Sequence, residues 1–120
     1  MVVDDEPVNR MVHKMHLQNY GSFIVSEHKT GKEAVEFICT LKDRNPGRVL
    51  ILMDINMPVM NGIEATKAIR AMTFSFPVVI VAVSAFSSEE DINRIMSCGM
   101  DSYVIKPLTK DKLAKMLDTL

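Results

Sequence analysis

The sequence has little excess charge of either sign, because 14 lysine and arginine residues nearly balance 15 aspartate and glutamate residues. Its formal net charge of -1 provides no basic surface of the kind that attracts nucleic acid or an acidic membrane. We therefore expect no nucleic-acid partner and no membrane contact for this domain, and any binding must depend on local chemistry.

Long hydrophobic runs are also missing. The longest hydrophobic run extends from Pro77 to Val83, with Ala85 and Phe86 beyond it. It is far shorter than the roughly 20 residues of a membrane span. No signal peptide is visible at the amino end. These absences predict a soluble domain in the cytoplasm, or also in the nucleus if the source is a eukaryote.

Cysteine is scarce, and the two that occur, Cys39 and Cys98, lack the spacing of metal ligands. We expect both to be small buried residues in a reducing compartment, with a disulfide as the weaker alternative. The chain of 120 residues, 48% of them hydrophobic, is long enough for one core and too short for two. It therefore predicts one domain over residues 1–120.

The stretch from Val49 to Gly62, VLILMDINMPVMNG, contains an unbroken apolar run that ends on the carboxylate of Asp54. Such a run is typical of a strand that helices cover on both faces. Asn56, Pro58 and Asn61 cannot continue the strand and predict a loop. In an open parallel sheet this loop lies where ligands bind, so Asp54 is the first candidate for chemistry.

Strand-like and helix-like segments alternate five times along the chain. Strands are expected at 1–3, 22–27, 49–54, 78–83 and 102–105, and helices at 7–20, 31–41, 63–72, from a Ser87–Glu90 capping box to Gly99, and after a Thr109 cap. Right-handed crossovers then give an α/β fold, a flavodoxin-like doubly wound parallel sheet of order 2-1-3-4-5. The first strand is short, so we expect the full protein to begin earlier.

Histidines and methionines have ordinary structural explanations in this pattern. His13 and His16 lie three residues apart without a third ligand, which favours a solvated helix face, and His28 is expected in a loop. The first helix is expected to place Val8 and Val12 inward. Five methionines fall at core-like spacing and are expected to pack inside, although part of the first helix could be a docking patch: Met11, Met15, Met72, Met96 and Met116.

Reactive side chains follow four of the strands at what would be one edge of the sheet. Asp4 and Asp5 follow the first strand, Asp54 the third, Ser84 the fourth and Lys106 the fifth. Carboxylates about 4 Å apart repel by roughly 4 kcal/mol, so a cation would stabilise the cluster, and oxygen ligands favour Mg²⁺. With Lys106 and Ser84 holding phosphoryl oxygens, Asp54 would be the nucleophile.

Four motifs together resemble the receiver domain of two-component response regulators. They are DDE at 4–6, MDINMPVMNG at 53–62, VSA at 83–85 and DSYVIKP at 101–107. The likeness covers essentially the whole chain, and four motifs in order are highly specific. The string MPVMNGIEATKAIR is most similar to receivers of hybrid sensor kinases and multistep phosphorelays, including plant ones.

The resemblance implies a metal site. Asp54 would be the phosphoacceptor and a Mg²⁺ ligand, Asp5 a direct ligand, Asp4 an indirect one, and the main-chain carbonyl of Asn56 a further ligand. The phosphoryl donor would be a histidine kinase or a histidine phosphotransfer protein that docks near the first helix and the Asp54 edge.

The resemblance also implies a switch. Ser84 and Lys106 would contact the phosphoryl group, Ser84 and Tyr103 would change position on activation, and Lys106–Pro107 would be a cis peptide bond. Serine stands at position 84 where threonine is commoner, so the hydroxyl is kept but the methyl is lost. The domain would switch or relay a signal and catalyse only its own phosphorylation and slow dephosphorylation.

A haloacid-dehalogenase-like phosphatase is the alternative, because it also forms an aspartyl phosphate on a similar sheet. That chemistry usually needs a second aspartate two residues after the nucleophile as general acid and base. Asn56 stands there and cannot transfer a proton, so the phosphoaspartate is expected to persist. A pure binding domain is a third possibility, against which the intact set of side chains argues.

Overall fold

The structure is a computed structural model that describes residues 1–44, 46–57, 59–85 and 88–119. Its five parallel strands form one sheet of order β2-β1-β3-β4-β5, as the sequence predicts. The strands are β1 (Val2–Val3), β2 (Glu27–His28), β3 (Val49–Asp54), β4 (Val78–Ser84) and β5 (Ser102–Ile105). The helices are α1 (Pro7–Tyr20), α2 (Gly31–Leu41), α3 (Gly62–Arg70), α4 (Glu89–Ser97) and α5 (Lys110–Asp118).

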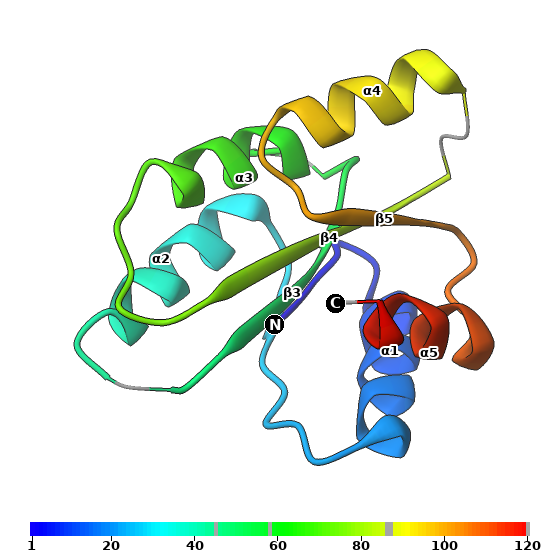
Figure 1. Cartoon of the computed structure of the whole chain (residues 1–120), viewed down its shortest axis with the longest axis horizontal. Coiled ribbons are helices and arrows are strands. Elements are labelled where there is room, and N and C mark those ends of the chain that lie inside the picture. Colours follow the sequence, from blue (N-terminus) through cyan, green and yellow to red (C-terminus); the bar gives the residue numbers. More distant parts are fainter. Residues whose placement is uncertain (45, 58, 86–87, 120) are drawn as a thin grey trace.

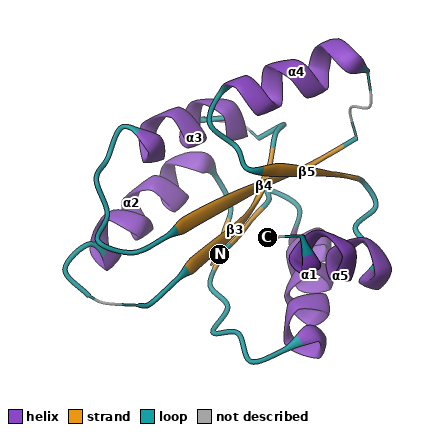
Figure 2. Cartoon of the chain, in the orientation of Figure 1, coloured by secondary structure: helices purple, strands orange, loops and turns teal. Residues whose placement is uncertain are grey.

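The sheet is the middle of three layers, with α1 and α5 on one face and α2, α3 and α4 on the other (Figures 1 and 2). Successive residues of the central strands point to opposite faces, so Ile51 packs with α2 and α3 while Leu52 packs with α1 and α5. Each of these side chains is at most 1% exposed. Full burial of such a side chain is worth about 1.5–3 kcal/mol, so both helix layers are held by apolar packing.

β2 is shorter than predicted, because residues 22–26 of the expected strand lie outside the ladder. β1 offers only Val2 and Val3 as pairing partners, and these match Glu27 and His28. Strand-forming composition does not create a strand where no neighbouring strand is available to pair with it. Ile24 is accordingly fully exposed.

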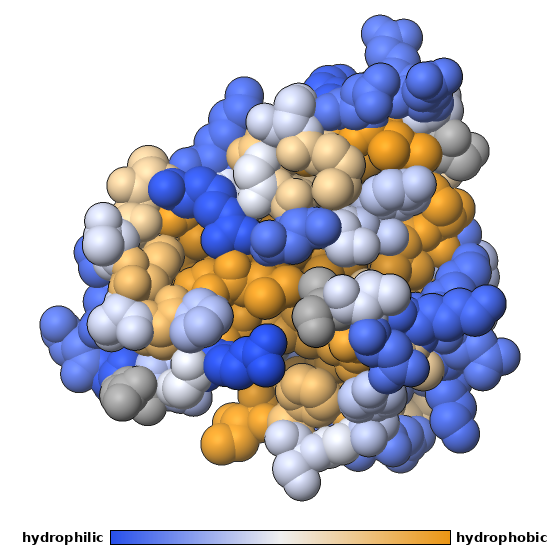
Figure 3. Space-filling model, viewed as in Figure 1, coloured by the Kyte–Doolittle hydropathy of each residue, from blue (hydrophilic) through white to orange (hydrophobic). Residues whose placement is uncertain are grey.

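A cavity of about 780 Å³ lies between residues 22–26 and the amino end of β3. Phe23, Val25 and Leu50 are among its apolar lining residues, and apolar side chains show on this side of the molecule in Figure 3. The Met1 ammonium donates a hydrogen bond to the Leu50 carbonyl across 2.6 Å. Met1 is therefore buried against β3.

α1 buries a different face from the predicted one. Arg10, His13 and Leu17 are its buried residues. Val8 and Met11 are 64% and 63% exposed, so the expected inward face was wrong. The helix has two faces of similar spacing, and the buried one contains polar side chains that the polar edge of the sheet satisfies, as the Arg10 bond to the Asp4 carbonyl shows.

Several other burial predictions were wrong. Met15 and Met96 are exposed, whereas Met116 packs in the core and the half-buried Met72 packs against it, as expected. His13, expected on a solvated face, is only 5% exposed. His28, expected in a loop, belongs to β2, where its ring lies 4.7 Å from that of Phe37. Periodicity alone could not separate a buried face from an exposed one of the same spacing.

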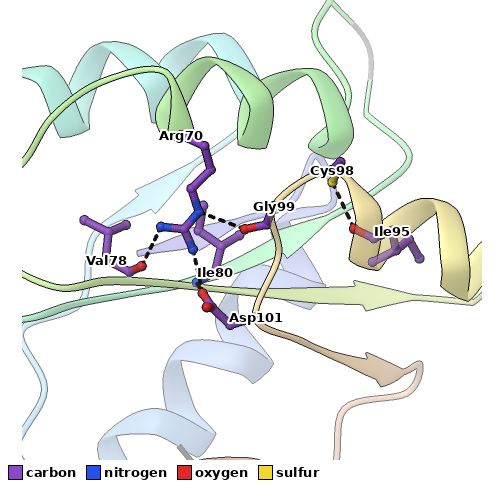
Figure 4. Close-up of polar contacts among 7 residues, drawn as sticks. All are labelled: Arg70, Val78, Ile80, Ile95, Cys98, Gly99 and Asp101. Atoms are coloured by element: carbon purple, nitrogen blue, oxygen red, sulfur yellow. Dashed lines mark hydrogen bonds and ion pairs between the residues drawn. The ribbon is translucent and has the colours of Figure 1, made fainter.

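The cysteines are also more accessible than predicted, since Cys39 is exposed and Cys98 is half-buried. Both are free thiols, so the disulfide alternative is wrong. The Cys98 Sγ donates to the Ile95 carbonyl at 3.0 Å (Figure 4). Cys98 packs against the core as a partly buried residue, whereas Cys39 is exposed and does not have the buried position that was expected.

The helix caps were predicted in part. Thr109 caps α5 as expected, by accepting from the Lys112 amide. α4 begins one residue later than the predicted box, because Ser88 is its cap and accepts from the Asp91 amide. The predicted cap Ser87 lies outside the described residues.

None of the described helices is long and apolar enough to cross a membrane.

Candidate functional site

Three acidic side chains meet at the carboxyl edge of the sheet, as the sequence predicts. Asp54 is the last residue of β3, and Asp4 follows β1, which pairs with β3 through Val3 and Met53. One carboxylate oxygen from each of Asp4, Asp5 and Asp54 lies within 4.8 Å of the others. Asp4 is fully buried and Asp54 is 4% exposed, whereas Asp5 faces solvent. The cluster is therefore open on one side.

Lys106 lies between two of these acids. Its Nζ is 3.1 Å from Asp54 Oδ1 and 3.5 Å from Asp4 Oδ2. Its main-chain N–H donates to the Ser84 carbonyl at 2.8 Å, which fixes the end of β5 against that of β4. The next peptide bond, Lys106–Pro107, is cis as expected. The topology thus brings together residues that are 52 positions apart in the sequence.

The surroundings of Asp54 disfavour the charged form of its carboxyl group. Burial and the nearby charge of Asp4 raise the pKa of Asp54 above its usual value, although Lys106 and a hydrogen bond from the Asn56 main chain act in the opposite direction. Burial alone would lower the pKa of Lys106, but Asp54 and Asp4 outweigh it and raise that pKa, so the lysine stays charged. One lysine does not balance three carboxylates, and a cation at this site would.

The donor atoms fit a hard divalent cation. Asp4 Oδ1 accepts the Glu6 amide at 2.9 Å, while Asp4 Oδ2 is buried with no hydrogen-bond donor among the described residues, at ion-pair distance from Lys106. Carboxylate oxygens are the ligands that Mg²⁺ prefers, and an open side lets it keep bound water. Asn56 lies exposed in the loop that follows Asp54.

Two further predicted residues lie on β4 and on the edge strand β5. Ser84 ends β4 and is 3% exposed, one residue beyond Val83, the partner of Asp54 in the ladder. Tyr103 pairs with Ala82, two residues before Ser84, so the Ser84 and Tyr103 side chains project from the same face of the sheet. Tyr103 is 38% exposed. Ser84 therefore lies at the site, and Tyr103 lies on the same face of the sheet but is partly exposed to solvent.

One residue of the site was not predicted from the sequence. Arg10 on α1 donates from Nη1 to the Asp4 carbonyl at 2.8 Å, and only 9% of it is exposed. A signal was present, because Arg10 shares a helix face with His13 and Leu17. Two of the three residues on that face are polar, so hydrophobic periodicity did not indicate that it is buried.

Comparison with known proteins gives one consistent result. The sequence profile of the response regulator receiver domain matches residues 1–118. A two-component response regulator of Oryza sativa subsp. japonica is 38% identical, with 98% of this chain and 89% of that protein covered. Two-component response regulator 24 of Arabidopsis thaliana is also 38% identical, with 100% and 81% covered. Hybrid signal transduction histidine kinase I of Dictyostelium discoideum is 33% identical over 99% of this chain, which corresponds to 7% of that protein.

Solved structures agree with these relatives. The receiver domain of a Pseudomonas aeruginosa PAO1 sensor histidine kinase, which has a magnesium ion in its active-site cleft, gives a TM-score of 0.80 at 30% identity, with 98% of this chain and 92% of that chain covered. Chemotaxis protein CheY4 of Vibrio cholerae gives 0.81 at 28% identity, with 98% and 93% covered.

Proposed function

Because this chain belongs to the family of response regulator receiver domains, we propose that Asp54 accepts a phosphoryl group from a phosphohistidine. The chain is a receiver module of two-component signal transduction, and its relatives include both response regulators and hybrid kinases. The alternative of a haloacid-dehalogenase-like phosphatase finds no support among these relatives.

The observation that carries the proposal is the position of Lys106, 3.1 Å from Asp54 Oδ1, at the carboxyl edge of the sheet. An oxygen of Asp54 attacks phosphorus while the bond from phosphorus to the donor imidazole nitrogen breaks, and that nitrogen keeps the electron pair and takes up a proton from solvent. The Lys106 ammonium is close enough to bind a phosphoryl oxygen as negative charge moves from Asp54 to the phosphoryl group. The buried Ser84 hydroxyl is placed to donate to another of them.

The acid cluster supports a Mg²⁺ requirement. We expect Asp5, Asp54 and the main-chain carbonyl of Asn56 to hold the ion directly, and Asp4 to act indirectly. The bound ion supplies positive charge that offsets the phosphoryl oxygens. The fit of an all-oxygen donor set within 4.8 Å is what supports this assignment.

Phosphorylation adds a charge of about -1.5 to -2 at Asp54. Ser84 and Tyr103 project from one face of the sheet, so a move of Ser84 toward the phosphoryl group would open space that the half-exposed Tyr103 ring can enter. Because Asn56 cannot act as a general base, the phosphoaspartate is expected to be hydrolysed slowly and to act as a signal, not as an intermediate of a phosphatase.

The exposed face of α1 is the expected docking surface for the donor. Val8, Met11 and Met15 lie at spacings of three and four residues, and they are 64%, 63% and 49% exposed. The helix begins two residues after Asp5, so this apolar stripe borders the acid cluster. A histidine kinase or phosphotransfer protein that covers the stripe would bring its phosphohistidine to Asp54. Such partners support the expectation of a cytoplasmic domain.

The test is phosphorylation measured by intact mass, with acetyl phosphate or a phosphorylated phosphotransfer protein as donor and with Mg²⁺ present. The wild type should gain one phosphoryl group and Asp54→Asn none. The matched control is Asp43→Asn, an exposed carboxylate away from the site, which should behave as the wild type. Equal labelling of Asp54→Asn, or steady turnover of a small phosphate ester, would overturn the proposal.

A further inference from the structure

The buried guanidinium of Arg10 donates a hydrogen bond to the main chain of the acid cluster. We propose that Arg10 is a positioning residue for the Mg²⁺ site, which holds Asp4, and through it Asp5, in the geometry that binds the ion. This inference rests on the proposed function, because it assigns a residue that prepares the same site.

Arg10 contacts Asp4 directly. Arg10 Nη1 donates to the Asp4 carbonyl at 2.8 Å in a buried position. That carbonyl belongs to the peptide bond that joins Asp4 to Asp5, so the hydrogen bond fixes the orientation of the peptide from which the Asp5 side chain leaves. A shift of this peptide would move an exposed acid that has no other fixed contact among those described here.

The other polar groups of Asp4 are also hydrogen-bonded, with one exception. Its N–H donates to the His28 carbonyl at 3.1 Å, and its Oδ1 accepts the Glu6 amide at 2.9 Å. With the Arg10 bond, every polar group of Asp4 except Oδ2 has a hydrogen-bonding partner. Oδ2 is the atom that points toward Lys106. Arg10 thus completes a set of contacts that leaves a single oxygen of Asp4 directed into the site.

Arg10 is itself held in place by Glu27. Its Nε lies 3.6 Å from Glu27 Oε1 on β2, and Lys14 Nζ lies 3.8 Å from Glu27 Oε2. Glu27 pairs in the ladder with Val2, so the guanidinium spans from β2 to the end of β1. Arginine suits this position because the separate nitrogens of its planar group donate in two directions at once, whereas the single nitrogen of a lysine ammonium cannot make both contacts with the same geometry.

A purely electrostatic role for Arg10 makes the opposite prediction. A positive charge behind the acids repels a divalent cation, so removal of that charge alone would strengthen Mg²⁺ binding. Loss of positioning would weaken it instead. Residues that orient metal ligands typically change metal affinity by about 10- to 100-fold when they are replaced. The sign of the change therefore distinguishes the two roles.

The experiment is a titration with MgCl₂ alone, followed by amide NMR shifts of the loops at the carboxyl edge. Arg10→Met should weaken Mg²⁺ binding by roughly tenfold or more. Arg10→Lys, which keeps the charge, should fall between Arg10→Met and the wild type. Glu27→Gln keeps the Arg10 bond to Asp4, so it should bind Mg²⁺ more tightly than either Arg10 variant.

Phosphorylation rates at increasing Mg²⁺ give a second measurement. For both Arg10 variants, saturating Mg²⁺ should restore most of the wild-type rate, because positioning affects the binding of the ion and not the attack by Asp54. Wild-type or tighter Mg²⁺ binding by Arg10→Met would overturn the inference, and a loss of thermal stability without a change in Mg²⁺ affinity would do the same. In either case, a wild type labelled at Asp54 leaves the proposed function intact, whereas a wild type that binds no Mg²⁺ overturns both.

Discussion

Arg70 Nη2 lies 2.6 Å from Asp101 Oδ2, and the same carboxylate oxygen accepts the Ile80 amide at 2.9 Å (Figure 4). Arg70 also donates from Nε to the Gly99 carbonyl and from Nη1 to the Val78 carbonyl, each at 2.8 Å. One side chain thus joins the end of α3, the start of β4 and the turn between α4 and β5. These segments lie on the side of the sheet away from α1.

Replacement of Arg70 by lysine should destabilise the fold by about 1–2 kcal/mol, because a single ammonium nitrogen cannot reach the three acceptors that Nε, Nη1 and Nη2 of arginine contact separately. An ion pair as exposed as this one contributes only about 0–1 kcal/mol, so a larger loss would come from the carbonyl contacts. Urea unfolding measures the difference. Arg44→Lys, at an exposed position, is the control and should stay within about 0.5 kcal/mol of the wild type. Equal stability of the two variants would contradict this assignment.

Gly99 and Gly47 form a matched pair for a test of backbone and contact strain. Both have positive φ, +111° and +84°, so alanine is strained at either site. An added Cβ at Gly99 would lie 2.9 Å from Arg70 Cγ, whereas none of the described atoms lies within 4 Å of one at Gly47. Gly99→Ala should therefore lose about 1–3 kcal/mol, and more than Gly47→Ala, in chemical denaturation. A larger loss at Gly47 would be evidence against the close contact.

In a protein whose chain begins at Met1, stability should rise with pH between about 6 and 8 because of the Met1 ammonium. Burial lowers the pKa of this group from 8.0 to about 6. In this interval the unfolded chain binds more protons than the folded one, so the stabilisation is complete above pH 8 and is lost as the pH falls toward 6. The change is at most about 2–3 kcal/mol, since each pKa unit corresponds to 1.36 kcal/mol. Acetylation of the amino group should flatten the unfolding free energy over this range, and an unchanged slope would contradict the burial of the charge.

Met11→Lys should slow phosphotransfer from a phosphohistidine protein by roughly tenfold, as expected when one apolar contact of about 1.4 kcal/mol is lost. Phosphorylation by acetyl phosphate should be unchanged, because a small donor needs no docking surface. Met96→Lys is the matched control, since Met96 is also exposed but lies on α4. A rate that falls equally with both donors would place the defect in the site and not in docking.

The parts of the fold that the sequence predicted best are those set by continuous apolar runs. β3 and β4 are covered on both faces, so burial leaves no choice of register or face, and both strands lie where they were expected. The site followed from them, because the topology places Asp54 and Lys106 at one edge. Chain order and crossover handedness were sufficient for this result.

The errors concern elements whose environment depends on distant neighbours. Residues 22–26 have strand-forming composition, but a strand needs a partner, and β1 supplies only two residues. On α1 the apolar stripe is exposed and a polar face is buried, because Arg10 and His13 lie against a polar edge. Hydrophobic periodicity cannot identify a buried face whose contacts are hydrogen bonds and ion pairs. This is also why Arg10 was not recognised as part of the site.

The burial of Met1 has a practical consequence for handling the protein. Any residues joined before Met1, in a tag, a fusion or a longer chain, would start beside the cavity between residues 22–26 and β3 and would turn the ammonium that donates to the Leu50 carbonyl into a peptide N–H. Thr119 differs, since it lies exposed just after α5. A label attached at Thr119 would therefore disturb no buried contact of the kind that Met1 makes.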